Sequence, residues 1–110
     1  MAVLVVLVTA PRDASDRIAE RLVSSRLAAC VNVVRGVRST YWWQGKVESA
    51  EEDLLIIKTD ESVYGELERA VKEVHPYEVP EIIALRVERG LEEYISWVSS
   101  SVSARGVERA

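Results

Sequence analysis

Residues 75–82, HPYEVPEI, gather side chains that could do chemistry. They include the only histidine of the chain, His75, together with Glu78 and Glu81. An imidazole titrates near neutral pH and is a natural ligand for zinc or copper, and carboxylates add oxygen ligands or act as general acids and bases. The alternative is structural: the two prolines fix a connection between a helix and a strand, and the glutamates face solvent. The segment by itself leaves both interpretations open.

Cys30 is the only cysteine, so neither an internal disulfide nor a cysteine-rich metal cage can form within one chain. Its neighbours in LAACVNV (residues 27–33) are small and apolar, which is typical of a buried cysteine that acts as a small hydrophobe. A role as a metal ligand, or in a dyad with His75, is the alternative.

Three consecutive aromatic residues, Tyr41, Trp42 and Trp43, form the second unusual cluster. Adjacent residues of a strand point to opposite faces, so at least one tryptophan is expected to leave the sheet of the monomer. Exposing two tryptophans is costly for a small protein, which favours a subunit interface. An aromatic ligand pocket is the alternative.

Composition bounds the class of protein. With 110 residues, 48% of them apolar, the chain is expected to form a single domain over residues 1–110. The longest apolar run, residues 2–8, is far shorter than the roughly 18 residues of a membrane span, so we expect a cytoplasmic protein without membrane contact. A formal charge of −4 argues against nucleic acid as a partner. Scarce labile residues and 29% charged residues fit a thermophile.

The catalytic signatures that we sought are missing from the sequence: it has no Walker A loop, G-x-S-x-G elbow or H-E-x-x-H helix. A hydrolase that uses His75 as its base would lack a recognisable nucleophile and oxyanion site. We therefore expect that the protein is not an enzyme.

The first two elements follow from apolar patterning. Residues 2–9 form a continuous valine-rich run, which predicts a strand buried on both faces and central in its sheet. Pro11 suits a helix start, and apolar residues at helical spacing predict a helix that ends near Ser25.

A long hairpin is expected next, from strands over residues 30–43 and 46–59 joined by a tight turn at Gln44 and Gly45. With this two-residue turn, the numbers of any two residues that pair across the hairpin should add up to 89. This register places Tyr41 opposite Glu48, Arg38 opposite Glu51 and Val33 opposite Ile56. The halves nearest the turn are polar, so we expect an arm that extends beyond the core of the monomer.

Asp60 is a good N-cap for a second helix, which Pro76 should stop at about Val74. A last strand over residues 82–87 and a short helix over residues 91–99 follow, and residues 100–110 are expected to fray. The predicted fold is therefore α+β: a ferredoxin-like βαββαβ sandwich, with a four-stranded antiparallel sheet, helices on one face, an extended β-hairpin arm and a short C-terminal helix. The unpaired edges of the arm predict an oligomer.

Several separated stretches carry a resemblance to a known family: RLAACVNV (26–33), YWWQGKVE (41–48), LLIIKT (54–59) and HPYEVPEI (75–82), with VTAP (8–11) and EYISWV (93–98). In this order and spacing, residues 3–98 resemble the divalent-cation tolerance protein family, CutA. The resemblance implies a ferredoxin-like homotrimer built by strand pairing, an architecture similar to PII signalling proteins, and tolerance to divalent metals, copper especially.

The resemblance also implies a set of site residues. They are the metal-ligating candidates His75, Glu78, Glu81 and Cys30, and Tyr77, Trp42, Trp43 and Lys58 as residues that line or support a cleft between subunits. Our first hypothesis is a trimer that binds copper, zinc or a similar divalent ion weakly at these clefts, without a required cofactor. The second is a signalling or interaction module that binds a small anion or a partner protein through Arg38, Lys46 and Lys58, with metal incidental.

Overall fold

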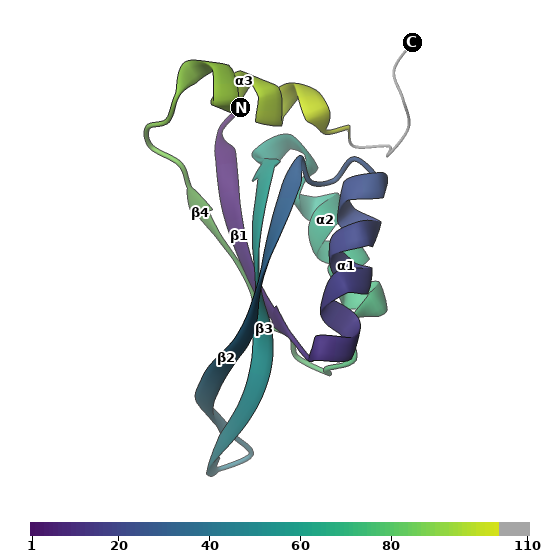
Figure 1. Cartoon of the computed structure of the whole chain (residues 1–110), viewed down its shortest axis with the longest axis vertical. Coiled ribbons are helices and arrows are strands. Elements are labelled where there is room, and N and C mark those ends of the chain that lie inside the picture. Colours follow the sequence, from purple (N-terminus) through teal and green to yellow (C-terminus); the bar gives the residue numbers. More distant parts are fainter. Residues whose placement is uncertain (104–110) are drawn as a thin grey trace.

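A four-stranded antiparallel sheet forms one layer of the structure and two helices form the other, as Figure 1 shows. The structure is a computed structural model that describes residues 1–103. The strands are β1 (Val3–Ala10), β2 (Cys30–Trp43), β3 (Lys46–Asp60) and β4 (Ile82–Arg86), in the order β2-β3-β1-β4. The predicted ferredoxin-like α+β fold is confirmed, and β1 is central as expected.

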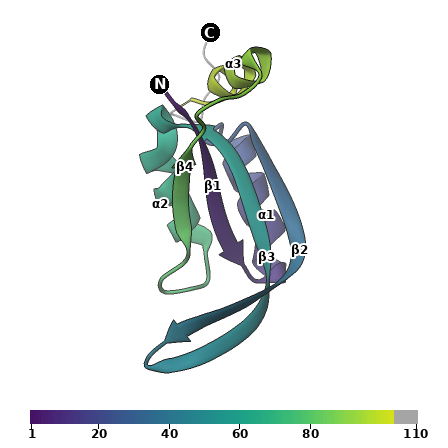
Figure 2. The same cartoon turned by 90° about the vertical axis from the view of Figure 1, so that its left-hand side faces the viewer.

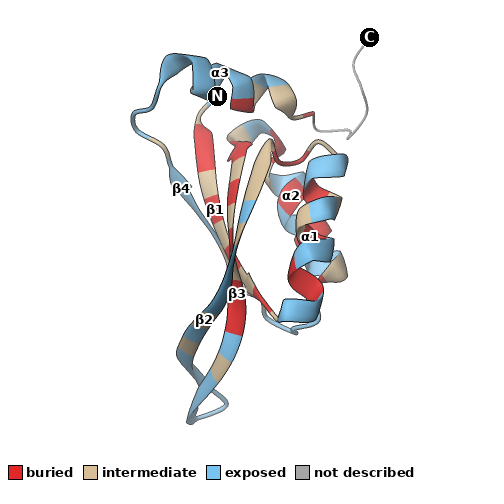
Figure 3. Ribbon diagram, in the orientation of Figure 1, coloured by how far each residue is buried: buried red, intermediate tan, exposed pale blue. Residues whose placement is uncertain are grey.

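The core lies between the sheet and helices α1 (Arg12–Ser24) and α2 (Tyr64–Val74). Apolar residues at helical spacing put Ile18 and Leu22 of α1 and Leu67 of α2 on the inner faces, where all three are fully buried. The alternating residues of β1 and β3 that face the helices are buried with them. Figure 3 shows this buried stripe beside an exposed hairpin. Burying one such side chain contributes about 1.5–3 kcal/mol.

The ends of α2 follow from single residues. The side chain of Asp60 accepts a hydrogen bond of 2.9 Å from the Ser62 N–H, so it is a cap as predicted. It caps a short 3-10 helix, Glu61–Val63, and the α-helix starts only after it. At the other end, Pro76 holds His75 in an extended conformation (φ −79°, ψ 133°), and α2 stops at Val74 as predicted.

The hairpin turn has the two residues that the sequence predicted. Gln44 and Gly45 have φ of 50° and 78°, the combination of a type I′ turn. Near the turn the predicted register is confirmed, with Tyr41 opposite Glu48 and Arg38 opposite Glu51. Closer to the sheet it is wrong, because Val33 lies opposite Leu55 and not Ile56.

A β-bulge in β2 causes this shift by one residue. The register breaks between Val34 and Val37, so that Arg35 and Gly36 together stand against Asp53. Gly36 has a φ of 73°, a conformation that favours glycine. The bulge separates the part of β2 in the sheet from the part in the arm.

Beyond the bulge, β2 and β3 pair only with each other, because β1 pairs with β3 no further than Asp53. Figure 2 shows the resulting arm, which bends away below the sheet. The arm accounts for the elongated shape of 48 × 28 × 22 Å. The predicted extended arm is confirmed.

The C-terminal elements differ slightly from the predicted ones. β4 ends at Arg86, one residue early, and α3 (Glu92–Ser101) begins one residue later and ends two residues later than expected. Ser100 and Ser101 are thus helical, and the predicted fraying of residues 104–110 falls outside the described residues. Figure 1 shows α3 crossing the end of the sheet next to the N-terminus, where Val98 is buried.

The second face of the sheet is covered only at one end, where α3 contacts β1 and β3 and where Val3 and Asp60 are buried. The prediction that β1 is buried on both faces therefore holds on the helix side, whereas on the other side Val3 is buried and Val5 and Leu7 stay partly exposed. We call this surface the open face. Its apolar residues are Val5, Leu7, Val34, Leu54, Ile56, Ile83 and Leu85.

Candidate functional site

A cleft lies between the hairpin arm and the segment that joins α2 to β4. Figure 2 shows the arm bending beneath this segment. The cleft measures about 780 Å³. Its lining consists of acidic, aromatic and hydroxyl-bearing residues with one valine and one proline, and contains no lysine, arginine or histidine. The lining residues are Thr9, Ser39, Thr40, Tyr41, Trp42, Trp43, Glu52, Tyr77, Glu78, Val79, Pro80 and Glu81.

Glu52 and Tyr77 form the floor of the cleft. The Tyr77 hydroxyl donates a hydrogen bond of 2.8 Å to Glu52 Oε2, and Glu52 is only 5% exposed. Burial of the hydroxyl, followed by its contact with the Glu52 carboxylate, raises the pKa of Tyr77 far above its usual value. Tyr77 therefore stays protonated and acts as a donor. Within residues 1–103, none of the ion pairs involves Glu52.

Glu78 and Glu81 lie at the solvent side of the cleft. Both are exposed, and Glu81 Oε1 is 3.5 Å from the Thr9 hydroxyl that donates to it. Together with Glu52 they put three carboxylates around one cleft without a basic side chain in its lining. Such an arrangement attracts cations and repels anions.

His75 stands behind the cleft and does not line it. It is 7% exposed and lies 2.8 Å from the carbonyl oxygen of Thr9 through Nε2, while Nδ1 accepts a hydrogen bond of 3.1 Å from the Tyr77 N–H. A carbonyl only accepts and an amide N–H only donates, so these contacts require a neutral ring with its proton on Nε2. His75 would have to give up one of these bonds to coordinate a metal. Its observed role is to anchor the segment that carries Tyr77.

Cys30 and Lys58 lie away from the cleft. Cys30 is opposite Lys58, which is opposite Val5, whereas His75 contacts Thr9 four residues further along β1. That offset is about 13 Å along the strand. A Cys30–His75 dyad is therefore not formed within one protomer. Lys58 donates hydrogen bonds to the Asn32 side chain and to the Ile56 carbonyl.

The three aromatic residues of the arm all line the cleft. Trp42 is 74% exposed, against 40% for Trp43 and 42% for Tyr41, so one tryptophan does leave the sheet of the monomer. Burial of Trp42 against another subunit stays a prediction.

A complete metal cage is not present within the protomer. Over residues 1–103, no three histidine, cysteine, aspartate or glutamate side chains are grouped closely enough to hold a metal ion. The structure thus brings Glu78, Glu81, Tyr77, Trp42 and Trp43 to one cleft, with His75 as a support. It does not bring Cys30 or Lys58 there.

Sequence reasoning missed Glu52. The signal available was strand parity, since Glu52 shares a face of β3 with Leu54, which lies opposite Thr9. What the sequence could not show is that the arm bends under residues 75–81, so that a strand carboxylate becomes buried beneath Tyr77.

The fold of the chain is an α+β fold of the ferredoxin-like, PII-like kind. The structure described as the PII-like protein CutA from Nostoc sp. PCC 7120 in apo form matches with a TM-score of 0.86 at 34% identity, over 94% of this chain and 99% of that one.

The family follows from the sequence profile described as CutA1 divalent ion tolerance protein, which matches residues 4–101. The chain belongs to this family. It is 48% identical over 95 residues to the divalent-cation tolerance protein CutA of Thermus thermophilus, covering 86% of this chain and 92% of the relative. The solved structure of the protein from that organism matches with a TM-score of 0.90 at 44% identity, over 92% and 99% of the two chains.

Plant relatives are longer. The rice protein CutA 1, chloroplastic, is 48% identical over 99 residues, which are 89% of this chain. The matched part spans only 56% of the rice protein and 54% of the Arabidopsis thaliana relative. Across residues 1–103, no helix has the length and apolarity needed to span a membrane.

Proposed function

We propose that this protein is a homotrimer that binds a divalent cation, copper or a similar ion, in the cleft of each protomer. The observation that carries the proposal is the lining of the cleft, which has three carboxylates and no basic side chain. The family description and the name of the Thermus thermophilus relative, which both refer to tolerance of divalent ions, agree with it.

The open face supports the oligomeric part of the proposal. Ile83 and Leu85 of β4 are 51% and 54% exposed, and both project from the open face, on the side of the sheet opposite α1 and α2. A contiguous apolar sheet surface of this kind marks a protein interface. A second copy of the chain is its proposed partner, and the number three rests on the resemblance to the family.

Glu78 and Glu81 are the proposed metal ligands within the protomer. Copper and zinc accept carboxylate oxygens, but they also favour nitrogen or sulfur ligands. The remaining positions would be filled by water or by side chains of a neighbouring copy. Cys30 and His75 take part only if assembly brings them to the cleft and His75 exchanges one of its present bonds.

Calorimetric titration of the metal-free protein with Cu²⁺ and Zn²⁺ tests the proposal. Saturable binding is expected in the wild type and should weaken about tenfold or more in a Glu78→Gln, Glu81→Gln double variant, because both carboxylate ligands are lost. Glu48→Gln, an exposed site on β3 outside the cleft lining, is the matched control. Binding that is absent, or that is equal in all three proteins, contradicts the assignment.

The alternative of a small anion has less support. Arg38, Lys46 and Lys58, which could attract an anion, do not line the cleft. The likeness to a PII-like protein remains its only support. A thermal-shift screen with metals, nucleotides and organic anions separates the two, since a ligand of the native state raises its melting temperature.

We also propose that the protein is not an enzyme and that it is located in the cytoplasm. The family description names a tolerance and no reaction. Relatives differ in their named locations: two plant proteins are called chloroplastic, and the Archaeoglobus fulgidus structure is described as periplasmic. Cell fractionation of the source organism tests the location.

A further inference from the structure

The floor of the cleft holds a buried carboxylate without a cationic partner. Glu52 is 5% exposed, and its one hydrogen-bond partner within residues 1–103 is the Tyr77 hydroxyl on Oε2. Removing a carboxylate from water is costly unless a counter-charge or several hydrogen bonds replace the water. Because Glu52 lines the cleft, a bound cation can supply that counter-charge.

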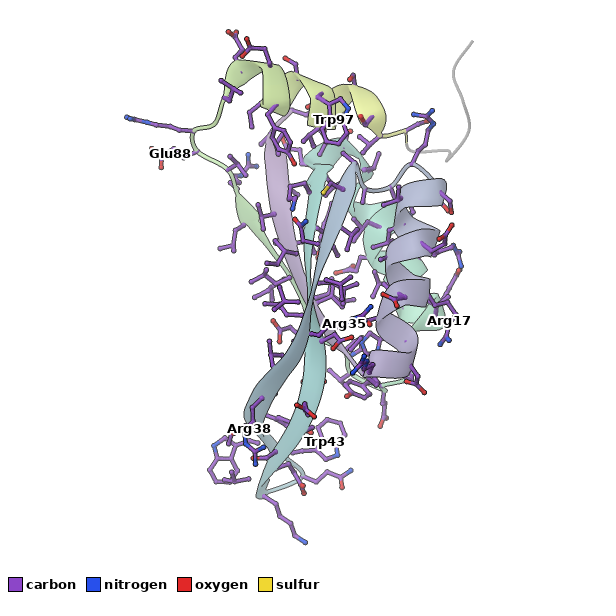
Figure 4. The ribbon with its side chains drawn as sticks, in the orientation of Figure 1. Arg17, Arg35, Arg38, Trp43, Glu88 and Trp97 are labelled. Atoms are coloured by element: carbon purple, nitrogen blue, oxygen red, sulfur yellow. The ribbon has the colours of Figure 1, made fainter. Side chains whose placement is uncertain are left out.

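Aromatic rings surround this carboxylate. Tyr41 and Trp43 line the cleft from the arm, and Tyr77 lines it from the opposite segment. Strand alternation puts Tyr41 and Trp43 on the face of β2 that also carries Val37, which pairs with Glu52. Figure 4 shows Trp43 and Arg38 projecting from opposite sides of the arm, so the arginine points away from the indole.

The floor of the cleft, which has Glu52 as its one carboxylate, is better suited to an organic cation than to a bare metal ion. A divalent metal needs several donor atoms, and no group of three metal-ligating side chains exists within residues 1–103. An ammonium or guanidinium group needs one counter-charge and aromatic faces, which attract cations through the ring quadrupole. The floor offers one carboxylate and three aromatic rings.

We propose that the cleft floor binds a monovalent organic cation, an ammonium or guanidinium group, with Glu52 as its counter-ion and Tyr41, Trp43 and Tyr77 as aromatic walls. Tyr77 is also a positioning residue, because its hydroxyl orients the Glu52 carboxylate. This inference does not depend on metal binding by Glu78 and Glu81.

The test uses tetramethylammonium and methylguanidinium chloride as probes. Each is titrated into ¹⁵N-labelled full-length protein at constant ionic strength, with sodium chloride as the baseline, and shifts of the tryptophan Nε1–H and Tyr77 amide signals are followed. Glu52→Gln keeps an oxygen that can accept from Tyr77 but removes the charge. Glu48→Gln removes an equivalent charge from the same strand outside the cleft lining.

Saturable shifts are expected in the wild type and in Glu48→Gln, with affinity reduced about tenfold or more in Glu52→Gln, as for loss of a charge-assisted contact. Trp43→Leu should also weaken binding by removing an aromatic wall. The proposal is overturned if the folded wild type shows no saturable response to either probe, or if Glu52→Gln binds as well as Glu48→Gln. Metal titration of Glu52→Gln keeps the two sites distinct, because metal binding at Glu78 and Glu81 is expected to survive.

Discussion

At the residue scale, one carboxylate joins the sheet, the bulge and the first helix. Asp53 is 1% exposed and accepts hydrogen bonds from the Ser15 hydroxyl (2.6 Å), from Arg35 (2.9 Å) and from the Gly36 N–H (3.2 Å). The Ser15 bond, followed by those from Arg35 and Gly36, holds the pKa of Asp53 below its usual value. Its negative charge is therefore part of the folded state.

Asp53→Asn should lower the free energy of unfolding at pH 7 by about 1–3 kcal/mol, the cost of disrupting a buried, charge-assisted network. The pKa of Asp53 is depressed in the folded state, so its stabilisation is complete above the unfolded value near 3.9 and is lost as the pH falls through the folded pKa. Urea unfolding between pH 2 and 7 measures both effects, with the loss of stability at acid pH smaller in the variant. Asp16→Asn, at the exposed partner of Arg35, is the control and should change little. Equal effects of the two substitutions would refute this account of the network.

The sequence showed which residues could take part in chemistry more reliably than it showed where the fold places them. The sequence marked His75, Glu78 and Glu81 as notable, and two of them do reach the cleft. It could not show that both nitrogens of His75 are used inside the protomer, because its contacts with Thr9 and Tyr77 depend on tertiary folding. Glu52 was missed for the same reason.

At the element scale, the bulge in β2 decides how the arm leaves the sheet. The turn residues predicted the register near Gly45, and it holds from Trp43 back to Val37. Composition gave no reliable signal for an extra residue at Arg35 and Gly36, so every pair beyond it was displaced by one. Local turn chemistry can be read from sequence, whereas a bulge depends on cross-strand contacts such as those of Asp53.

Gly36→Ala should destabilise the protein by about 1 kcal/mol, because alanine must adopt a φ of 73° at the bulge. The space around it is not the obstacle, since a methyl carbon at this position would lie 3.6 Å from its nearest neighbour, Glu51 Oε2. Denaturant unfolding checks the prediction.

Gly65→Ala is the matched control, because it makes the same change within α2, where alanine is favoured over glycine and a methyl carbon is no closer than 4.0 Å to Arg69. It should stabilise the protein by about 0.5–1 kcal/mol. If both substitutions stabilise equally, the positive φ at Gly36 carries no cost and the account of the bulge is wrong.

At the scale of the whole molecule, the open face indicates assembly. The apolar run of β1 predicted burial on both faces, yet Val5 and Leu7 on the open face stay partly exposed within one chain. This difference favours an oligomer, because in a monomer the valine and leucine side chains of the open face would remain in contact with water.

Leu85→Glu should shift the mass in solution from that of the proposed trimer toward that of a monomer, since it places a charge in the proposed interface. Val23→Glu, an exposed apolar site on α1 outside the open face, should leave the mass unchanged. Light scattering coupled to size-exclusion chromatography distinguishes the two. A wild type that is monomeric, or a Leu85→Glu protein that stays trimeric, contradicts an interface on the open face.

The most direct test of the central claim, a cation-binding cleft in an assembled CutA-family protein, is anomalous diffraction from crystals grown with Zn²⁺ or Cu²⁺. The account predicts an anomalous peak beside Glu78 and Glu81 in every copy of a three-fold assembly. Crystals at saturating metal whose clefts hold no peak, or whose metal lies only at Cys30, would contradict it.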